Sequence, residues 1–373
     1  MKLKFPLKFP VKFDAKIPDS AYDVFSSGAA IVVGLLAGLI ILLLSNASQA
    51  FYAFETILVS GFSTMNDLGQ VFYFATPIIL TGLSVGFAAK TGLFNIGAAG
   101  QFIVGAYAAV FVGVRCDFLP GHLHWITALA AALLAGALWG SIPGIFKALF
   151  NVNEVIACIM TNYIGMYLVN YLITRTVYDS FRNQSMPVVA SANLPKMGMD
   201  KIFKEGFIVS SVNSGVLIAI AASIIIYIIL ERTTFGYSLK ACGFNRDAAR
   251  YAGINEKRSI ILSMTISGAL AGLGGALLFL SGSGIGITVV DMLAQEGFNG
   301  IPVALLGLNN PIGIIFAGLF ISYLNVGGFN MQLYNFAPQV IDIIIAVIIY
   351  FSAFALLVRG FLVSLGKRKR GEL

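Results

Sequence analysis

The chain has 373 residues, of which 58% are hydrophobic and 11% are charged, whereas an ordinary soluble domain carries about 25% charged residues. Its mean hydropathy is +0.87. A water-soluble fold cannot hide so much apolar surface, because its exterior needs polar groups. The composition therefore excludes a soluble enzyme and a nucleic-acid-binding domain. The formal net charge of +7 is informative about topology, because the cytoplasmic loops of membrane proteins are enriched in Lys and Arg.

Long apolar runs recur along the whole chain. About 20 apolar residues cross a bilayer core, and we predict nine helices of that kind. A shorter apolar stretch covers 298–308 and ends at the turn signal Asn309-Asn310-Pro311. The nine predicted spans are residues 28–50, 68–89, 92–114, 125–146, 155–174, 212–230, 259–281, 312–326 and 338–358.

The basic residues decide the topology. They gather at the N-terminus, in residues 231–258 and at the C-terminus. If these places face the cytoplasm together with Lys90 and Lys147, 18 of the 24 basic residues lie inside. Two cytoplasmic ends need an even number of crossings, so we predict that 298–308 crosses as a short or broken helix. The expected fold is an all-α polytopic membrane bundle of about ten transmembrane helices, one or two of them broken, with both termini cytoplasmic.

Charge also divides the chain into parts. The N-terminal arm alternates Lys with apolar residues, and we expect it to lie on the anionic inner leaflet. A signal peptide cleaved near Ser48-Gln49-Ala50 is the alternative for the first span; the long charged arm favours an uncleaved helix. The predicted parts are a basic arm at 1–27, one transmembrane domain at 28–358 with an external loop at about 175–211 and a cytoplasmic loop at about 231–258, and a basic tail at 359–373.

Glycine is frequent, at 40 residues, and much of it falls at a four-residue spacing. Small-residue faces of this kind let two helix backbones approach closely in lipid. Two other glycine-rich segments, 91–100 and 282–300, contain polar residues and predict broken helices, because irregular backbone at membrane depth must be buried in protein or line a wet cavity. The spaced glycines are Gly34/Gly38, Gly136/Gly140/Gly144 and Gly268/Gly272.

Polar side chains inside the predicted spans are candidates for a substrate path, because lipid disfavours them unless they have a function or a partner. Their amides suit the hydroxyls and base edges of a nucleoside, and equally the hydroxyls of a sugar. Helix capping or interhelical hydrogen bonding is the alternative for each; Asn153 and Glu154 have the pattern of an N-cap and a first-turn acid, and Asp342 fits the same alternative. The candidates are Asn95, Gln101, Asn162, Glu296 and Asn299.

The sequence offers few clusters of residues that could bind a metal, form disulfides or catalyse a reaction. Three cysteines, Cys116, Cys158 and Cys242, are far apart and predict neither a disulfide framework nor a zinc site. His122 and His124 lie near Cys116, but that loop offers no fourth ligand, so we expect no metal. The sequence contains no catalytic constellation and no Walker A motif. The chain is therefore expected to be neither an ATPase nor another enzyme, and any energy from ATP must come from a separate subunit.

The predicted cytoplasmic loop contains a short helix at about 246–252. Asn245 can cap its start, Asp247 lies in its first turn and Gly253 fits the position after its end. Two turns of helix are unstable alone in water, so the segment needs a partner surface; a solvated connector is the alternative. Ala248, Ala249 and Ala252 leave a low flank for close approach, and Arg246, Arg250 and Tyr251 supply contacts.

The same loop carries a resemblance to a known family. Its pattern, Leu239-x3-Gly243-x-Asn245-x2-Ala248-Ala249-x3-Gly253-Ile254, resembles the coupling loop of ABC-importer permeases of the ribose and branched-chain amino-acid type. The segments at 91–109, 153–172 and 296–320 resemble one branch of it, the permeases of nucleoside importers. The resemblance runs from about residue 28 to 358. One departure is Ala99, where that branch usually has an acidic residue.

The resemblance implies a multi-pass subunit of the cell membrane without ATPase activity, which provides the path for a nucleoside or related ribose-containing solute. ATP and Mg²⁺ would bind to a separate cytoplasmic ATPase, and this chain would carry no cofactor. The further partners would be a second, similar permease in a heterodimer, an external substrate-binding lipoprotein and membrane lipid. The residues implied to couple to the ATPase are Gly243, Asn245, Ala248, Ala249 and Gly253.

Two other classes of function compete with this one. An ion-coupled secondary transporter of a small polar solute needs ionisable or cation-coordinating groups near the midplane of the membrane. The acids of this chain lie near the ends of predicted spans, and the structured cytoplasmic loop would have no evident use there. A membrane-embedded enzyme lacks any catalytic constellation in the sequence. We therefore favour the importer permease.

Overall fold

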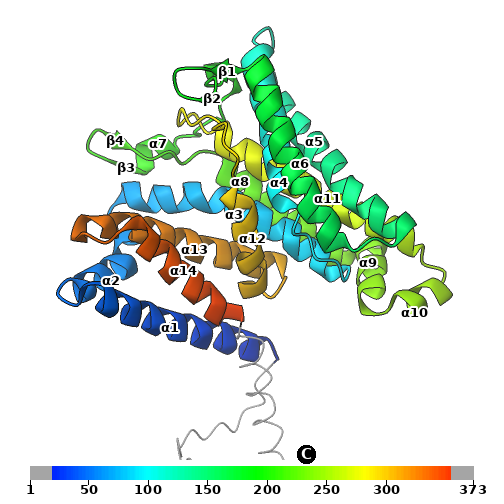
Figure 1. Cartoon of the computed structure of the whole chain (residues 1–373), viewed down its shortest axis with the longest axis horizontal. Coiled ribbons are helices and arrows are strands. Elements are labelled where there is room, and N and C mark those ends of the chain that lie inside the picture. Colours follow the sequence, from blue (N-terminus) through cyan, green and yellow to red (C-terminus); the bar gives the residue numbers. More distant parts are fainter. Residues whose placement is uncertain (1–18, 354–373) are drawn as a thin grey trace, which may run out of the picture.

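The computed structural model describes residues 19–353, which are mostly helical (Figure 1). The predicted basic tail and most of the basic arm lie outside the described residues. The elements are α1 (Asp19–Asn46), α2 (Ala50–Val59), η1 (Ser60–Phe62), α3 (Met65–Lys90), α4 (Ala98–Arg115), α5 (Gly121–Phe150), α6 (Glu154–Thr176), β1 (Tyr178–Asp179), β2 (Gln184–Ser185), η2 (Ala190–Ala192), α7 (Met199–Ile202), β3 (Lys204–Glu205), β4 (Ile208–Val209), α8 (Gly215–Arg232), α9 (Thr234–Phe244), α10 (Arg246–Tyr251), α11 (Glu256–Phe279), α12 (Gln295–Leu306), α13 (Pro311–Met331), η3 (Gln332–Tyr334) and α14 (Pro338–Ala353).

Seven helices within residues 19–353 are long and apolar enough to cross a membrane. Each of them overlaps a span predicted from the sequence, so the polytopic helical class is confirmed. The predicted N-cap at Asn153 is also confirmed, because its side chain accepts a hydrogen bond from the Val155 backbone N–H. The seven are α3, α4, α5, α6, α8, α11 and a helix that covers α13 and η3.

Helix α3 forms the centre of the molecule. Most of its side chains are buried, and it packs against α8, α11, α12 and α13. The Thr64 hydroxyl caps its start by accepting from the Asp67 backbone N–H at 3.0 Å. A helix that is apolar all round in this way is stable only when protein surrounds it. Figure 1 shows α3 between the α13–α14 side and the α4–α5–α6–α11 side of the bundle.

Two glycine-spaced faces meet where α5 packs against α11. A side-chain carbon added at Gly136 would lie 2.3 Å from the Gly268 carbonyl oxygen, and one added at Gly140 would lie 2.8 Å from the Gly268 Cα. Gly272 likewise lies against Gly136. No side chain separates the two backbones at these points, which is the close approach that the spacing predicts.

The first and last described helices pack against each other. Helix α1 contacts α14 along its length, and Gly38 lies against the side chain of Ile344. Helix α1 begins at Asp19, so residues 19–27 of the predicted basic arm are part of a helix. The last predicted span continues past Ala353, beyond the described residues.

Both segments predicted as breaks are irregular. Residues 91–97 form turns before α4 begins at Ala98, and residues 281–294 form an extended loop between α11 and α12. Helix α12 has only 12 residues and is too short to cross a bilayer alone. The loop before it is tied to the predicted external loop by hydrogen bonds of its own backbone; the Val289 N–H, for example, donates to the Asn183 carbonyl at 3.0 Å.

The predicted external loop folds into small, mostly extended elements. Two antiparallel hairpins, β1–β2 and β3–β4, lie at the end of the bundle opposite α9 and α10 (Figure 1). The Ser185 N–H donates to the Ile287 carbonyl at 2.8 Å, which ties the first hairpin to the 281–294 loop. His124 is fully buried; its ring nitrogens contact the Ser191 hydroxyl at 2.8 Å and the Val112 carbonyl at 2.9 Å. His124 therefore ties α5 to this loop.

Candidate functional site

A cavity of about 950 Å³ lies between the two sides of the bundle. Helices α3, α4, α11, α12, α13 and α14 and the loop before α12 line it. Its wall combines aromatic rings with amides and carboxylates at membrane depth, the composition typical of a site for a small polar solute with apolar faces. The aromatic residues are Phe74, Phe102, Phe279, Phe298 and Phe329, and the polar ones are Thr288, Gln295, Glu296, Asn299, Asn325, Gln332 and Asp342.

The start of α12 is held tightly in place. The Thr81 hydroxyl donates to the Glu296 carbonyl oxygen at 2.9 Å. A side-chain carbon at Gly297 would lie 2.3 Å from the Ala99 Cα, and one at Gly300 would lie 2.5 Å from the Thr81 carbonyl carbon. The backbone that carries the cavity residues of α12 is therefore fixed against α3 and α4.

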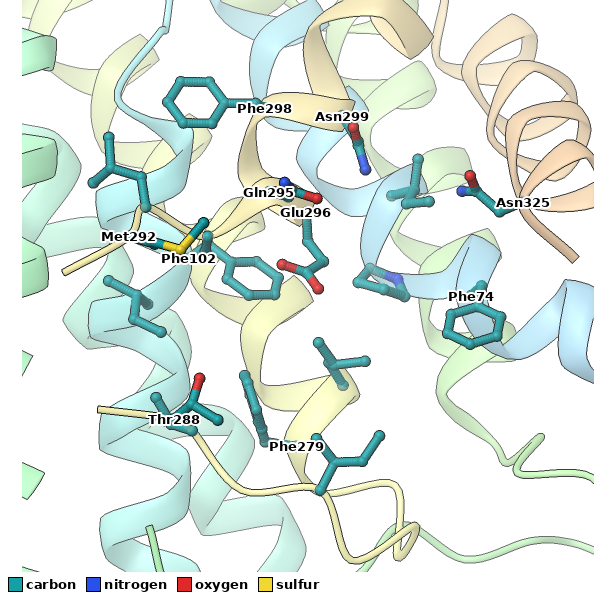
Figure 2. Close-up of a pocket in the computed structure, with 18 of the residues that line it drawn as sticks. Phe74, Phe102, Phe279, Thr288, Met292, Gln295, Glu296, Phe298, Asn299 and Asn325 are labelled. Atoms are coloured by element: carbon teal, nitrogen blue, oxygen red, sulfur yellow. The ribbon is translucent and has the colours of Figure 1, made fainter. Parts of the chain in front are cut away.

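Two predicted path residues, Glu296 and Asn299, line the cavity. Figure 2 shows both side chains extending from α12 into it, with the Glu296 carboxylate beside the ring of Phe102. Both are partly buried. Neither side chain has a hydrogen-bond or ion-pair partner among the described residues. They are therefore available to a ligand.

The other three predicted path residues lie elsewhere and are not among the residues that line the cavity. Asn95 and Gln101 pair through their amides at 2.8 and 3.1 Å, and Asn95 also donates to the Ser84 hydroxyl at 3.0 Å. Asn162 accepts from the Gly100 N–H at 2.8 Å and donates to the Ile96 carbonyl at 3.0 Å. All three side chains are at most 2% exposed. They hold the irregular start of α4 against α3 and α6, the interhelical alternative stated for them.

Several residues that line the cavity were not among the predicted path residues. Asn325 is an amide inside the apolar span 312–326, so its position was a usable signal. The five phenylalanines gave no signal, because 30 Phe residues are spread along the chain and only the fold shows which of them converge. Ala99, the departure noted in the sequence, is 1% exposed and packs directly on Gly297.

The predicted cytoplasmic loop contains a helix of 11 residues, α9, followed by the short helix α10. The predicted cap is confirmed: the Asn245 side chain accepts from the Ala248 N–H at 3.0 Å. Gly253 has a φ of 83° and ends α10, and the Ile254 N–H returns to the Ala249 carbonyl at 3.0 Å. A side-chain carbon added at Gly243 would lie 2.5 Å from the Lys90 carbonyl oxygen, so α9 packs closely on the end of α3.

The exposed face of α10 includes Ala248, Arg250 and Ala252, as predicted, but it does not include Ala249. Ala249 is only 4% exposed, because position 249 lies on the side of the helix opposite Asp247 and Tyr251. Its side chain is turned into the chain and cannot form part of a low flank for a partner. Tyr251 is 95% exposed and Phe244 is 90% exposed, and Ala248 is exposed as well. These residues form the accessible surface.

Comparison with known proteins places the chain in a family. Residues 67–353 match the family model described as "Branched-chain amino acid transport system / permease component". The chain is 39% identical over 352 residues to the guanosine ABC transporter permease protein NupP of Bacillus subtilis, covering 91% of this chain and 95% of the relative. It is 35% identical to the nucleoside ABC transporter permease protein NupB of Lactococcus lactis, covering 92% and 96%.

More distant relatives extend the comparison. The glucose ABC transporter permease protein TsgB13 of Haloferax volcanii is 31% identical, over 86% of this chain and 84% of the relative. The same B. subtilis and L. lactis strains each hold a second similar permease, NupQ and NupC, at 27% and 26% identity over 72% and 70% of this chain. No solved structure matches. The chain therefore belongs to the family of permease components of branched-chain amino acid transport systems, and it is a multi-pass protein of the cell membrane.

Proposed function

We propose that the chain is one of two permease subunits of an ATP-driven importer and that its 950 Å³ cavity forms part of the path of a nucleoside. The observation that carries this is the wall of the cavity, where five phenylalanines face amides and carboxylates. Aromatic rings suit the flat apolar faces of a base, and the polar groups suit its edges and the ribose hydroxyls. The likeness to a guanosine and a nucleoside permease over more than nine-tenths of the chain supports the same substrate class.

We infer ten crossings with both termini in the cytoplasm. The seven long apolar helices supply seven of them, and α1 and α14 supply two more. The tenth consists of the 281–294 loop and α12 together: the loop contacts the β1–β2 hairpin, and Asn309, just after α12, lies near Gly86 at the opposite end of α3. A crossing that is half loop and half helix is typical of sites where a membrane protein binds its substrate.

We infer that α10 docks onto a separate ATPase, which binds ATP and Mg²⁺. Exposed Tyr251 and Phe244 support this, because large aromatic side chains left in water at a short helix are typical anchors of an interface. Replacing Tyr251 by Ala should lower transport and substrate-stimulated ATP hydrolysis about tenfold or more while leaving the subunit folded. Tyr237→Ala on α9 is the control, since Tyr237 is 69% exposed but lies off α10. Equal loss in both variants would contradict docking through α10.

The second permease and the external binding protein are further parts of the proposal. Tyr163, Tyr167 and Tyr171 follow one another at four-residue spacing on α6 and are 48%, 55% and 58% exposed. Tyrosine normally lies at the membrane interface, so a stripe that reaches the middle of a span favours a protein neighbour over lipid. The fully exposed Phe181 and Phe207 at the hairpin tips favour contact with a protein at the outer end.

The deciding experiment is uptake by the complete importer in proteoliposomes. Radiolabelled guanosine should enter only with enclosed ATP and with all partner subunits present, and unlabelled glucose should not compete. Uptake by this chain alone under a proton or sodium gradient would instead support the ion-coupled alternative. Competition by glucose but not by nucleosides would assign the cavity to sugars.

A further inference from the structure

Glu296 has an unusual position among the acids of the chain. Its backbone is fixed by the Thr81 hydroxyl and by the close contact of Gly297 with Ala99. Its carboxylate has no partner among the described residues. A carboxylate at membrane depth is costly unless it is paired, so the position favours a ligand that brings donors of its own.

The surroundings restrict what that ligand can be. Among the described residues, no Lys, Arg or His lines the cavity, so no cation of the chain can neutralise Glu296 there. Figure 2 shows the carboxylate beside the ring of Phe102, with Phe279 on the same side of the cavity. A planar group whose faces lie against these rings would present its edge, and not its face, to the carboxylate.

The edges of the nucleobases differ in how they match a carboxylate, which only accepts hydrogen bonds when it is ionised. Guanine offers two adjacent donors, N1–H and the N2 amino group, which can reach the two oxygens in parallel, as an Arg fork does. Hypoxanthine offers only N1–H. Adenine and cytosine present an unprotonated ring nitrogen beside their amino group, and uracil presents N3–H between two carbonyls. Only guanine satisfies both oxygens.

We propose that Glu296 is the specificity-determining residue of the cavity and that it selects a base with two adjacent N–H donors. This inference rests on the proposed transport of nucleosides and names the class within it: guanosine before inosine, and inosine before adenosine, cytidine and uridine. The ribose hydroxyls would then form hydrogen bonds with two neutral amides, those of Asn299, one turn further along α12, and Asn325 on α13.

The test compares initial uptake rates of guanosine and adenosine by the complete importer in proteoliposomes, with the binding protein identical and saturating throughout. The contribution of the binding protein then cancels when the guanosine-to-adenosine ratio of uptake rates of each variant is divided by that of the wild type. Glu296→Gln replaces one acceptor by a donor and matches adenine, which has one of each. The guanosine-to-adenosine ratio should fall about 10- to 100-fold, the usual discrimination of a paired hydrogen bond.

Glu256→Gln is the matched control, because Glu256 is the first-turn acid of α11 as Glu296 is of α12 but lies outside the cavity. It should leave the ratio unchanged. Glu296→Asp keeps both acceptor oxygens and should keep the preference for guanosine even if its overall uptake rate falls. It provides a second test if the Glu296→Gln variant does not assemble into the importer.

Two results would overturn the inference. One is an unchanged ratio in Glu296→Gln with guanosine still carried, in which case nucleoside transport stands and only the role of Glu296 fails. The other is a fall in the ratio caused by Asp342→Asn and not by Glu296→Gln. If the wild type carries glucose and no nucleoside, the proposed function fails first, and this inference fails with it.

Discussion

Two groups of polar side chains at membrane depth both contain asparagine, yet their surroundings differ completely. The first, the amide cluster of Asn95, Gln101 and Asn162, is at most 2% exposed, and the protein supplies its hydrogen bonds. The second, Glu296 and Asn299 on α12, lines a cavity, and its side chains have no partner among residues 19–353. Residue type alone does not separate the asparagines of the two groups. What separates them is whether the fold already satisfies their hydrogen bonds, because only unsatisfied groups can gain from binding a ligand.

The difference predicts opposite consequences of substitution. In the amide cluster a lost side chain leaves buried donors and acceptors of the protein without partners, so stability falls. On α12 a lost side chain takes away contacts with the substrate, so transport falls and stability does not. The following predictions test this division, in order of decreasing expected cost in stability.

Asn162→Leu should have the largest effect. It leaves the buried Gly100 N–H and the partly buried Ile96 carbonyl without these partners, which costs about 2–5 kcal/mol for two such groups. Thermal unfolding in detergent, followed by size-exclusion chromatography, measures the loss. Asn170→Leu on the same helix is the control, because its single bond to the Val290 carbonyl is exposed. Equal melting temperatures for wild type and Asn162→Leu would contradict a structural role.

Gly300→Ala should come next. Its new methyl group would lie 2.5 Å from the Thr81 carbonyl carbon, so α12 must shift, at a cost of about 1–3 kcal/mol. Because α12 carries the cavity residues, we expect transport to fall along with the melting temperature. Gly28→Ala on α1 is the matched control, because nothing lies within 4 Å of the side-chain carbon added at that position. A stable Gly300→Ala with normal uptake would show that the start of α12 is not held as described.

Ser84→Ala should cost about 1 kcal/mol, the usual value of one hydrogen bond. It removes the acceptor of the Asn95 amide at 3.0 Å, while the pairing of Asn95 with Gln101 remains. The control is Ser48→Ala, whose bond to Asn46 is exposed and should contribute nothing measurable. Denaturation of both variants in the same detergent gives the comparison. A fall in guanosine uptake without a fall in stability would move Ser84 into the substrate path.

Asn299→Leu should leave stability within about 0.5 kcal/mol, because its amide has no partner in the described part of the chain and so no hydrogen bond of the fold is lost. Uptake of the transported nucleoside should nevertheless fall about tenfold, since a polar contact of the cavity is lost. Measuring the melting temperature and the uptake rate on the same preparation separates the two effects. A large drop in stability would place Asn299 with the amide cluster.

Much of the fold follows from sequence patterns, because hydrophobic runs of about 20 residues and capping residues act locally. The caps at Asn153 and Asn245 and both irregular segments were predicted this way. The start of α1 was placed too late, since Asp19 and Asp23 interrupt hydropathy without interrupting the helix. The cavity could not be predicted as a whole: its phenylalanines come from α3, α4, α11, α12 and α13, and only tertiary packing brings them together.

The backbone contact between α5 and α11 has a mechanical consequence. Where Gly136 and Gly140 touch Gly268 and Gly272, no side-chain rotamer can absorb a displacement of one helix against the other. We expect the pair to move as one rigid body. Helix α11 begins only a few residues after α10 and ends beside the cavity at Phe279. We therefore expect a displacement of α10 to move the end of α11 that lies beside the cavity.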